Sequence, residues 1–273
     1  MKMFCPIHSF DVSFRKAKRI QSELRNLVEI RDTVAHIEKI DLVGGVDVAY
    51  ITSNLVPSIK LDGETESFSA DSPEQHTRKR DVRKTNSVAV AVAVTLDTKS
   101  SRVVETVCAA APVFFPYVPG FLSFREGPAV LKAVGGLSVL PKVMIYDGCG
   151  IAHPRGLGLA SHMGLLTGIP SVGCAKSLLC GSCEEPGPLK GERTVIRYKD
   201  CIVGTCLRTR DNVRPVYVSP GSGVGIDSAR EIVLSLALKY RLPEPTRLAH
   251  NLVTEYKKNL VSEHKEAKET KMF

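Results

Sequence analysis

Residues 42–51 read LVGGVDVAYI, an apolar run whose single charged residue is Asp47. Valine and isoleucine favour strands, so the run predicts a buried strand. Two similar runs follow at 88–96 and 103–111, joined by a short polar turn at 98–101. The short turn favours antiparallel pairing of the last two runs. We expect all three runs to form an antiparallel meander, with a longer loop in its first hairpin.

The chain outside this meander alternates between helical and strand patterns. Apolar residues at helical spacing predict an amphipathic helix over 12–31, with Arg15, Lys16, Lys18 and Arg19 on its other faces. We expect further helices at 124–135, 157–167, 228–240 and from Pro243, and strands at 143–146, 171–175, 194–207 and 213–218. Capping boxes are expected at Ser123 with Glu126 and at Ser228 with Glu231.

This order of elements predicts one α/β domain over residues 1–273. Its sheet is expected to be mixed, because an antiparallel meander precedes β–α–β crossovers, and helices are expected to flank it. A polar insertion at 57–86 contains the basic run HTRKRDVRKT (76–85), for which a solvated loop, a nucleic-acid contact and a localisation patch are all open. The charged tail after about residue 260 is expected to fray.

The charge balance favours a polyanionic partner. Lys and Arg total 37 against 29 Asp and Glu, a formal net charge of +8, and cations that meet phosphates release condensed counterions. Apolar runs fall short of the roughly 18 residues that a membrane helix needs, and the first residues lack a signal-peptide pattern. We therefore expect an intracellular, cytoplasmic protein without a membrane partner, with the nucleus as the alternative in a eukaryote.

The eight cysteines argue against a disulfide framework in an intracellular chain. Cys180 and Cys183 have CxxC spacing, and Cys201 and Cys206 follow, so a four-cysteine zinc site is an alternative. Cys201 and Cys206 flank a predicted strand, which favours ordinary buried cysteines.

Three acidic residues are candidates for chemistry. Asp47 lies inside an apolar strand, where an unpaired carboxylate is costly, and Asp147 ends the strand predicted at 143–146. If these two strands are parallel neighbours, both carboxylates lie side by side at the edge where ligands bind in α/β sheets. Two close acids repel each other unless a cation such as Mg²⁺ lies between them. Glu126 is a third candidate, with the capping box as its structural alternative.

Four separated stretches resemble the endonuclease V family. They are VGGVDVAY (43–50), PYVPGFLSFREGP (116–128), YDGCGIAHPRGLGLASHMGLLTGIPSVGCAKSLLCG (146–181) and YRLPEPTRLAH (240–250). The resemblance implies a ribonuclease-H-like fold and a Mg²⁺-dependent endonuclease, with Mn²⁺ as a substitute. It also implies a cut on the 3′ side of deoxyinosine in DNA or of inosine in RNA, as DNA repair or nucleic-acid processing.

The resemblance further implies roles for individual residues. Metal binding falls to Asp47, Glu126 and Asp147, while Lys176 steadies a phosphate or the attacking water. Tyr117, with Pro119 beside it, is expected as a wedge that enters the space left by a distorted base. The resemblance assigns a pocket for the rotated-out base to Gly148 and Gly150, and supporting strand contacts to His153 and His162.

Two departures from the family pattern bear on activity. Ser222 stands where the family usually has a histidine, which raises the alternative of a lesion-binding protein with weak or lost cleavage. His250 stands where the family tends to have an acid.

Asp227 is expected near the active face, or else as a helix N-cap. The glycine run at 221–225 does not match a nucleotide-binding fingerprint, so no nucleotide cofactor is expected. A related nuclease with another substrate is the third interpretation.

Overall fold

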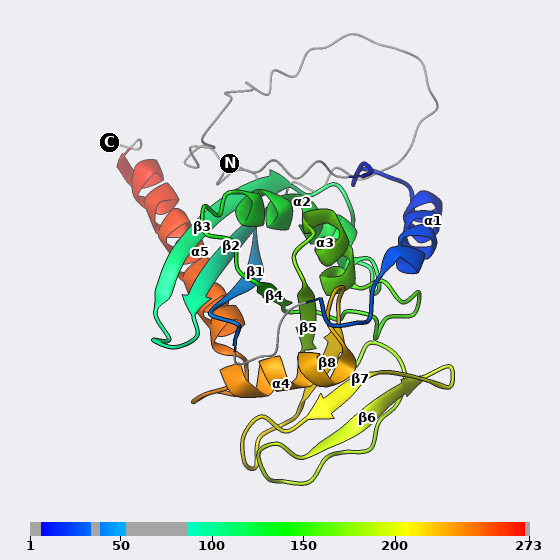
Figure 1. Ribbon diagram of the computed structural model, residues 1–273. Coiled ribbons are helices and arrows are strands. Elements are labelled where there is room, and N and C mark those ends of the chain that lie inside the picture. Colours follow the sequence, from blue (N-terminus) through cyan, green and yellow to red (C-terminus); the bar gives the residue numbers. More distant parts are fainter. Residues whose placement is uncertain (1–6, 34–38, 53–86, 271–273) are drawn as a thin grey trace.

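The computed structural model describes residues 7–33, 39–52 and 87–270. Its eight strands form one sheet in the order β3-β2-β1-β4-β5-β8-β7-β6 (Figure 1). The strand bounds are β1 Leu42–Thr52, β2 Ser87–Asp97, β3 Val103–Pro112, β4 Val143–Tyr146, β5 Ser171–Ala175, β6 Arg193–Tyr198, β7 Cys201–Leu207 and β8 Val216–Pro220. β1, β2 and β3 pair antiparallel, while β4 is parallel to both β1 and β5. The predicted mixed sheet with an antiparallel meander is confirmed.

Helices cover both faces of this sheet (Figure 1). Their bounds are α1 Phe14–Leu24, with the 3-10 turn η1 Arg25–Leu27, α2 Leu122–Gly135, α3 Leu159–Thr167, α4 Ile226–Leu236 and α5 Glu244–Thr270. α2 packs on β2 and β3, α5 packs on β1 and β2, and α4 packs on β7 and β8. Within the described residues, no helix is both long and apolar enough to cross a membrane.

The alternating sequence of β2 explains how two helices sandwich one strand. Ala89, Ala91 and Ala93 face the core shared with α2, while Val90 and Val92 face the core shared with α5. Because side chains alternate across a strand, a Val–Ala repeat places small residues on one face and branched residues on the other. All of these side chains are buried.

Several expected boundaries are wrong. The helix expected over 12–31 is α-helical only over Phe14–Leu24. The strand expected at 194–207 is the hairpin β6–β7, which turns at Lys199 and Asp200 with φ angles of 50° and 61°. Turns of this kind suit the twist of a hairpin. α5 continues to Thr270, so the charged residues after Leu260 lie in a helix where fraying is expected.

Both predicted capping boxes are also wrong. α2 begins at Leu122 after Phe121, and α4 begins at Ile226 after Gly225, so neither helix has a serine at its N-cap. The basic insertion expected at 57–86 lies outside the described residues, so its role stays a prediction.

Candidate active site

The site begins where β1 extends past β4. The last parallel pair of these strands is Val46 with Tyr146, whereas β1 stays paired with β2 as far as Thr52. Asp47 and Asp147 directly follow that last pair on neighbouring strands. The prediction that the two strands are parallel neighbours is therefore confirmed.

Glu126 reaches the same region from α2. Its Oε1 accepts a hydrogen bond of 2.8 Å from the hydroxyl of Tyr50, which lies further along β1. The guanidinium of the preceding Arg125 lies over the Tyr50 ring, 4.4 Å from its centroid. Glu126 is thus held by β1 rather than by its own helix terminus, because the Ser123 hydroxyl pairs with His162.

Burial and mutual repulsion dominate the electrostatics of these acids. Burial raises the pKa of Glu126 to about 8, and the charges of Asp47 and Asp147 add to the increase. Burial also raises the pKa of Asp47, and Asp147 contributes to this shift. Negative charges confined together in this way favour an added cation.

Two neighbouring side chains partly neutralise the acids. Lys176, directly after β5, forms an ion pair with Asp147 Oδ2. Burial lowers the pKa of Lys176, but the hydrogen bond and attraction of Asp147 outweigh burial and raise it overall. His250 of α5 donates from Nδ1 to Asp47 Oδ2 at 2.6 Å. The residue that departs from the family pattern therefore contacts a predicted metal ligand.

The three acids do not converge on one point in this conformation. Among the described residues, no group of three or more His, Cys, Asp or Glu side chains is placed to hold a metal ion. Each carboxylate is bound to a different partner: His250 for Asp47, Lys176 for Asp147 and Tyr50 for Glu126. The donor set nevertheless fits a hard divalent cation, since carboxylate oxygens are its preferred ligands and repulsion among the three acids still raises the pKa values of Asp47 and Glu126.

Tyr117 lies in an exposed loop at the same end of the sheet. Its side chain is 71% exposed, and Pro119 beside it is also exposed. The loop follows β3, whose last residue Pro112 pairs with Val88 near the end of β1 that carries Asp47. An exposed ring at this end of the sheet fits the wedge expected from the sequence.

The loop is closed by one carbonyl that accepts three hydrogen bonds. Gly120 O accepts from Gln21 Nε2 at 2.9 Å, from His153 Nε2 at 2.9 Å and from Arg155 Nη2 at 2.6 Å. Gly120 has a φ of 80°, a conformation that glycine adopts without strain. Gln21, Arg155 and Tyr50 were not predicted as site residues, because no local sequence pattern marks a contact between distant segments.

Gly150 does not open space for a base. A Cβ on Gly150 would lie 1.9 Å from Pro220 O, so the protein backbone itself fills the position. The Gly150 amide donates to Ser219 Oγ at 2.8 Å, and the Gly148 amide donates to Tyr146 O at 2.9 Å. In this conformation neither amide is available to read a base, contrary to the expectation from the sequence.

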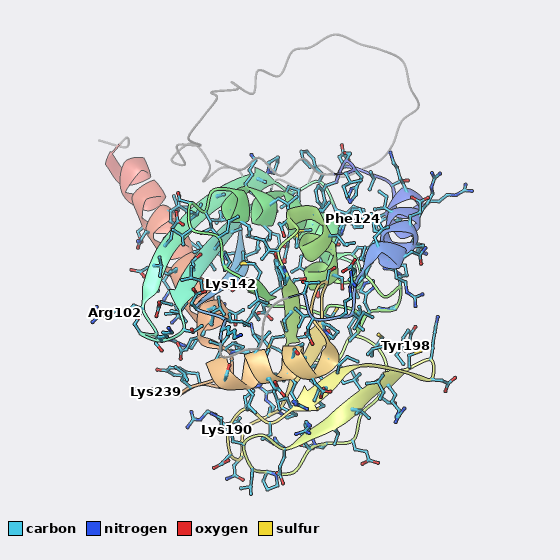
Figure 2. All side chains as sticks on the ribbon, viewed as in Figure 1. Arg102, Phe124, Lys142, Lys190, Tyr198 and Lys239 are labelled. Carbon is cyan, nitrogen blue, oxygen red and sulfur yellow. The ribbon has the colours of Figure 1, made fainter. Side chains whose placement is uncertain are left out.

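The two histidines also differ from their expected role as strand contacts. His153 and His162 are 2% and 0% exposed. Burial lowers the pKa of His153 to about 4 and that of His162 to about 3. His162 bonds Ser123 Oγ at 2.9 Å and lies 5.4 Å, centroid to centroid, from the ring of Phe124 in α2, which is labelled in Figure 2. Both histidines support the site from inside the protein.

Ser222 and Asp227 lie away from the acids. Ser222 N donates to Ser171 Oγ at 2.9 Å, and Ser171 begins β5, whereas Lys176 follows its other end. Five strand residues span about 16 Å, which exceeds the reach of a histidine side chain. Asp227 is exposed in the first turn of α4 and pairs with Arg230 at 2.7 Å. The expectation that Asp227 lies near the active face, or caps the helix, is wrong.

The cysteines form no zinc site in the part of the chain that the structure describes. Cys206 is buried and Cys183 packs against the same small apolar cluster, while Cys201 is exposed at the β6–β7 turn. These are ordinary cysteines of a packed interior and a hairpin.

A mixed sheet that brings acids from two parallel strands beside a lysine fits the class of α/β enzymes that cleave phosphodiesters with a metal ion. The family model for endonuclease V matches residues 77–251. The endonuclease V of Kosmotoga olearia is 39% identical over 260 residues, which cover 95% of this chain and 98% of the relative. The chain belongs to the endonuclease V family.

Solved structures agree with this assignment. The endonuclease V of Streptomyces avermitilis superposes with a TM-score of 0.75 at 37% identity, covering 92% of this chain and 96% of that one. The Ciona intestinalis endonuclease V shares the fold, with a TM-score of 0.67 at 23% identity over 90% of this chain and 98% of that one. That protein was solved with a 24mer DNA containing an inosine followed by a ribo-adenosine.

Proposed function

We propose that this protein is an endonuclease that cuts a nucleic-acid strand on the 3′ side of deoxyinosine or inosine. The observation that carries the proposal is that Asp47, Glu126 and Asp147 lie near enough to one another, where β1 extends past β4, for the charges of the two aspartates to raise the pKa of Glu126. The exposed Tyr117 loop lies at the same end of the sheet. The Ciona complex with inosine-containing DNA, from a protein of the same fold, indicates the kind of substrate.

The acids are proposed to hold Mg²⁺, with Mn²⁺ as a substitute. When bound, such an ion polarises the scissile phosphate and lowers the pKa of water. Asp47, Glu126 and Asp147 supply its oxygen ligands, and their buried, mutually repelling charges favour its binding. Lys176 is close enough to Asp147 to steady an incoming phosphate oxygen.

His250 is proposed to position Asp47 and to exchange protons with the reacting groups. Its Nδ1 is bound to Asp47, and its side chain is half exposed, with 52% of its surface accessible. An imidazole that is oriented by a carboxylate and open to water can donate and accept protons. His250 therefore occupies a catalytic position that an acid often fills in the family.

Tyr117 is proposed to enter the stack when the modified base rotates out. Stacking of a base on an aromatic ring contributes about 1–3 kcal/mol. Because the Gly148 and Gly150 amides are already bonded, base recognition requires either local rearrangement or other donors near the loop. We also propose that residues 1–273 act as one catalytic domain in the cytoplasm or nucleus, where the nucleic-acid substrate occurs, without a nucleotide cofactor.

The alternative of a lesion-binding protein without cleavage was motivated by Ser222. Ser222 lies at the opposite end of β5 from Lys176, so a serine at this position is a weak reason to expect a loss of cleavage. A related nuclease with another substrate stays open to test, as does the choice between DNA and RNA.

The test is cleavage of end-labelled DNA and RNA strands that carry one inosine, with matched adenosine strands and with Mg²⁺, Mn²⁺ or EDTA. We expect cuts 3′ of inosine only with metal, and a loss of at least about a hundredfold in Asp47→Asn, since metal catalysis contributes several kcal/mol. Asp227→Asn, at an exposed aspartate outside the site, is the matched control and should retain activity. Equal inertness of the wild type and Asp47→Asn would refute the enzyme, and tight inosine-dependent binding without turnover would favour the alternative.

A further inference from the structure

α1 carries a cationic face to which the site described above assigns no role. Ala17, Ile20, Gln21 and Leu24 are buried, while Arg15, Lys16, Lys18 and Arg19 are exposed. Arg19 pairs with Glu23 at 2.8 Å, with both side chains largely exposed. Within the described residues, Arg15, Lys16 and Lys18 have no ion-pair partner.

The helix is fixed to the Tyr117 loop at two points. The Phe14 ring lies 4.8 Å from Phe115 and 5.6 Å from Phe121, the residues that bound the loop. One turn before the helix ends, Gln21 donates to Gly120 O at 2.9 Å and accepts from Arg155 Nε at 2.5 Å. The cationic face and the Tyr117 loop therefore form one rigid unit.

This placement puts the charges beside the path of a bound strand. A strand whose base meets Tyr117 continues past the loop in both directions, and α1 lies against the loop (Figure 1 shows α1 in blue beside α3). The eleven residues of α1 span about 16 Å, which matches the rise of about five nucleotides of one strand. Lys and Arg on such a face suit phosphates rather than base edges.

We propose that the exposed face of α1 (Arg15, Lys16, Lys18 and Arg19) binds the phosphate backbone of the nucleic acid that the Tyr117 loop engages, a few nucleotides from the modified base. This inference rests on the proposed function for the identity of the bound strand. The contact is independent of base sequence, and it orients the strand because Gln21 and Phe14 hold the helix against the loop.

The test compares two double variants with matched charge loss. Lys16→Gln/Lys18→Gln removes two charges from α1, and glutamine preserves helix propensity. Lys99→Gln/Arg102→Gln removes two exposed charges at the β2–β3 turn, which lies at the opposite end of the sheet from Thr52. Arg102 is labelled at the far side of the molecule from α1 in Figure 2.

Binding of fluorescent duplexes with inosine or with adenosine is measured in EDTA over a series of salt concentrations. For the α1 variant, the slope of log K against log salt should become shallower by about 1.8, since each duplex phosphate contact contributes about 0.9. The loss should be equal for both duplexes, and the control variant should match the wild type. Unchanged melting temperatures establish that both variants are folded.

A slope equal to that of the wild type, or an equal change in the control, would overturn the inference. Binding of α1 to phosphatidylserine vesicles without any effect on duplex binding would also overturn it. If inosine strands are not cleaved but the α1 slope still changes, the proposed function fails and the backbone contact stands. If cleavage is observed and the α1 variant binds normally, only the contact fails.

Discussion

Replacing Glu126 with Gln should stabilise the metal-free protein while removing its activity. The pKa of Glu126 rises from 4.5 to about 8, chiefly through burial. Because the folded state holds this proton more tightly than the unfolded state, stability falls as the pH rises from 4.5 to about 8 and levels off above it. Glutamine keeps an acceptor for the Tyr50 hydroxyl but carries no charge to bury.

The pKa difference sets an upper limit on the effect. A shift of about 3.5 units corresponds to about 5 kcal/mol, since each unit is worth about 1.36 kcal/mol. Glu126 keeps part of its surface accessible, so solvent screening reduces this limit, and we expect a gain of about 2 kcal/mol at pH 9. At pH 5, where the wild-type carboxyl is protonated, the two proteins should be equally stable.

Urea unfolding in EDTA at a series of pH values from 5 to 9 measures this difference. Glu105→Gln is a control of opposite sign, because Glu105 accepts hydrogen bonds of 2.9 Å from Ser138 N and 2.8 Å from Val139 N that lower its pKa. The charged Glu105 carboxylate stabilises the folded protein at pH values above the pKa that Glu105 has in the unfolded chain. Glu105→Gln should therefore be less stable than the wild type at neutral pH. A difference between wild type and Glu126→Gln that does not change with pH would refute the reasoning.

Three further changes test the assignment of individual residues. Ser222→His should leave inosine cleavage within about twofold of the wild type, since that position lies at the other end of β5; a large gain in cleavage rate would place it in the site. Gln21→Ala should lower the free energy of unfolding by about 1–3 kcal/mol, because Arg155 Nε loses its acceptor and a fully buried side chain is removed, and denaturant melts would detect this. Tyr117→Ala should weaken inosine discrimination about tenfold or more, through lost stacking, whereas Phe114→Ala, at another exposed aromatic of the same segment, should not; equal effects in binding assays would contradict the wedge.

The fold was largely predictable because its strands carry strong local signals. The runs at 42–51, 88–96 and 103–111 are continuous and apolar, and the short turn at 98–101 favours antiparallel pairing of the last two. The β6–β7 hairpin was predicted as one strand, since its turn residues Lys199 and Asp200 are not the usual glycine or asparagine. Helix starts were misplaced because Ser123 serves a buried histidine rather than a helix end.

The site was predictable only where it depends on strand ends. Asp47 and Asp147 follow from the register of two parallel strands, which local pattern and topology together define. Glu126 was a candidate from the sequence, but only the family resemblance grouped it with the two aspartates, because its hydrogen bond to Tyr50 joins residues far apart in the chain. The same holds for Gln21, whose contact with Gly120 carries no sequence signal. Gly150 was misassigned because a glycine that admits a ligand and one that admits backbone look identical in sequence.

The unequal lengths of β1 and β4 explain why the acids can share one region without sharing one partner. β1 continues past Val46 paired only with β2. Side chains from α2 and α5 therefore reach the edge of β1 that β4 no longer covers, and they reach it from opposite faces of the sheet. Glu126 arrives from one face and His250 from the other, and Asp47 lies between them on β1. A cation bound there would compete with His250 and Lys176 for the oxygens they now occupy.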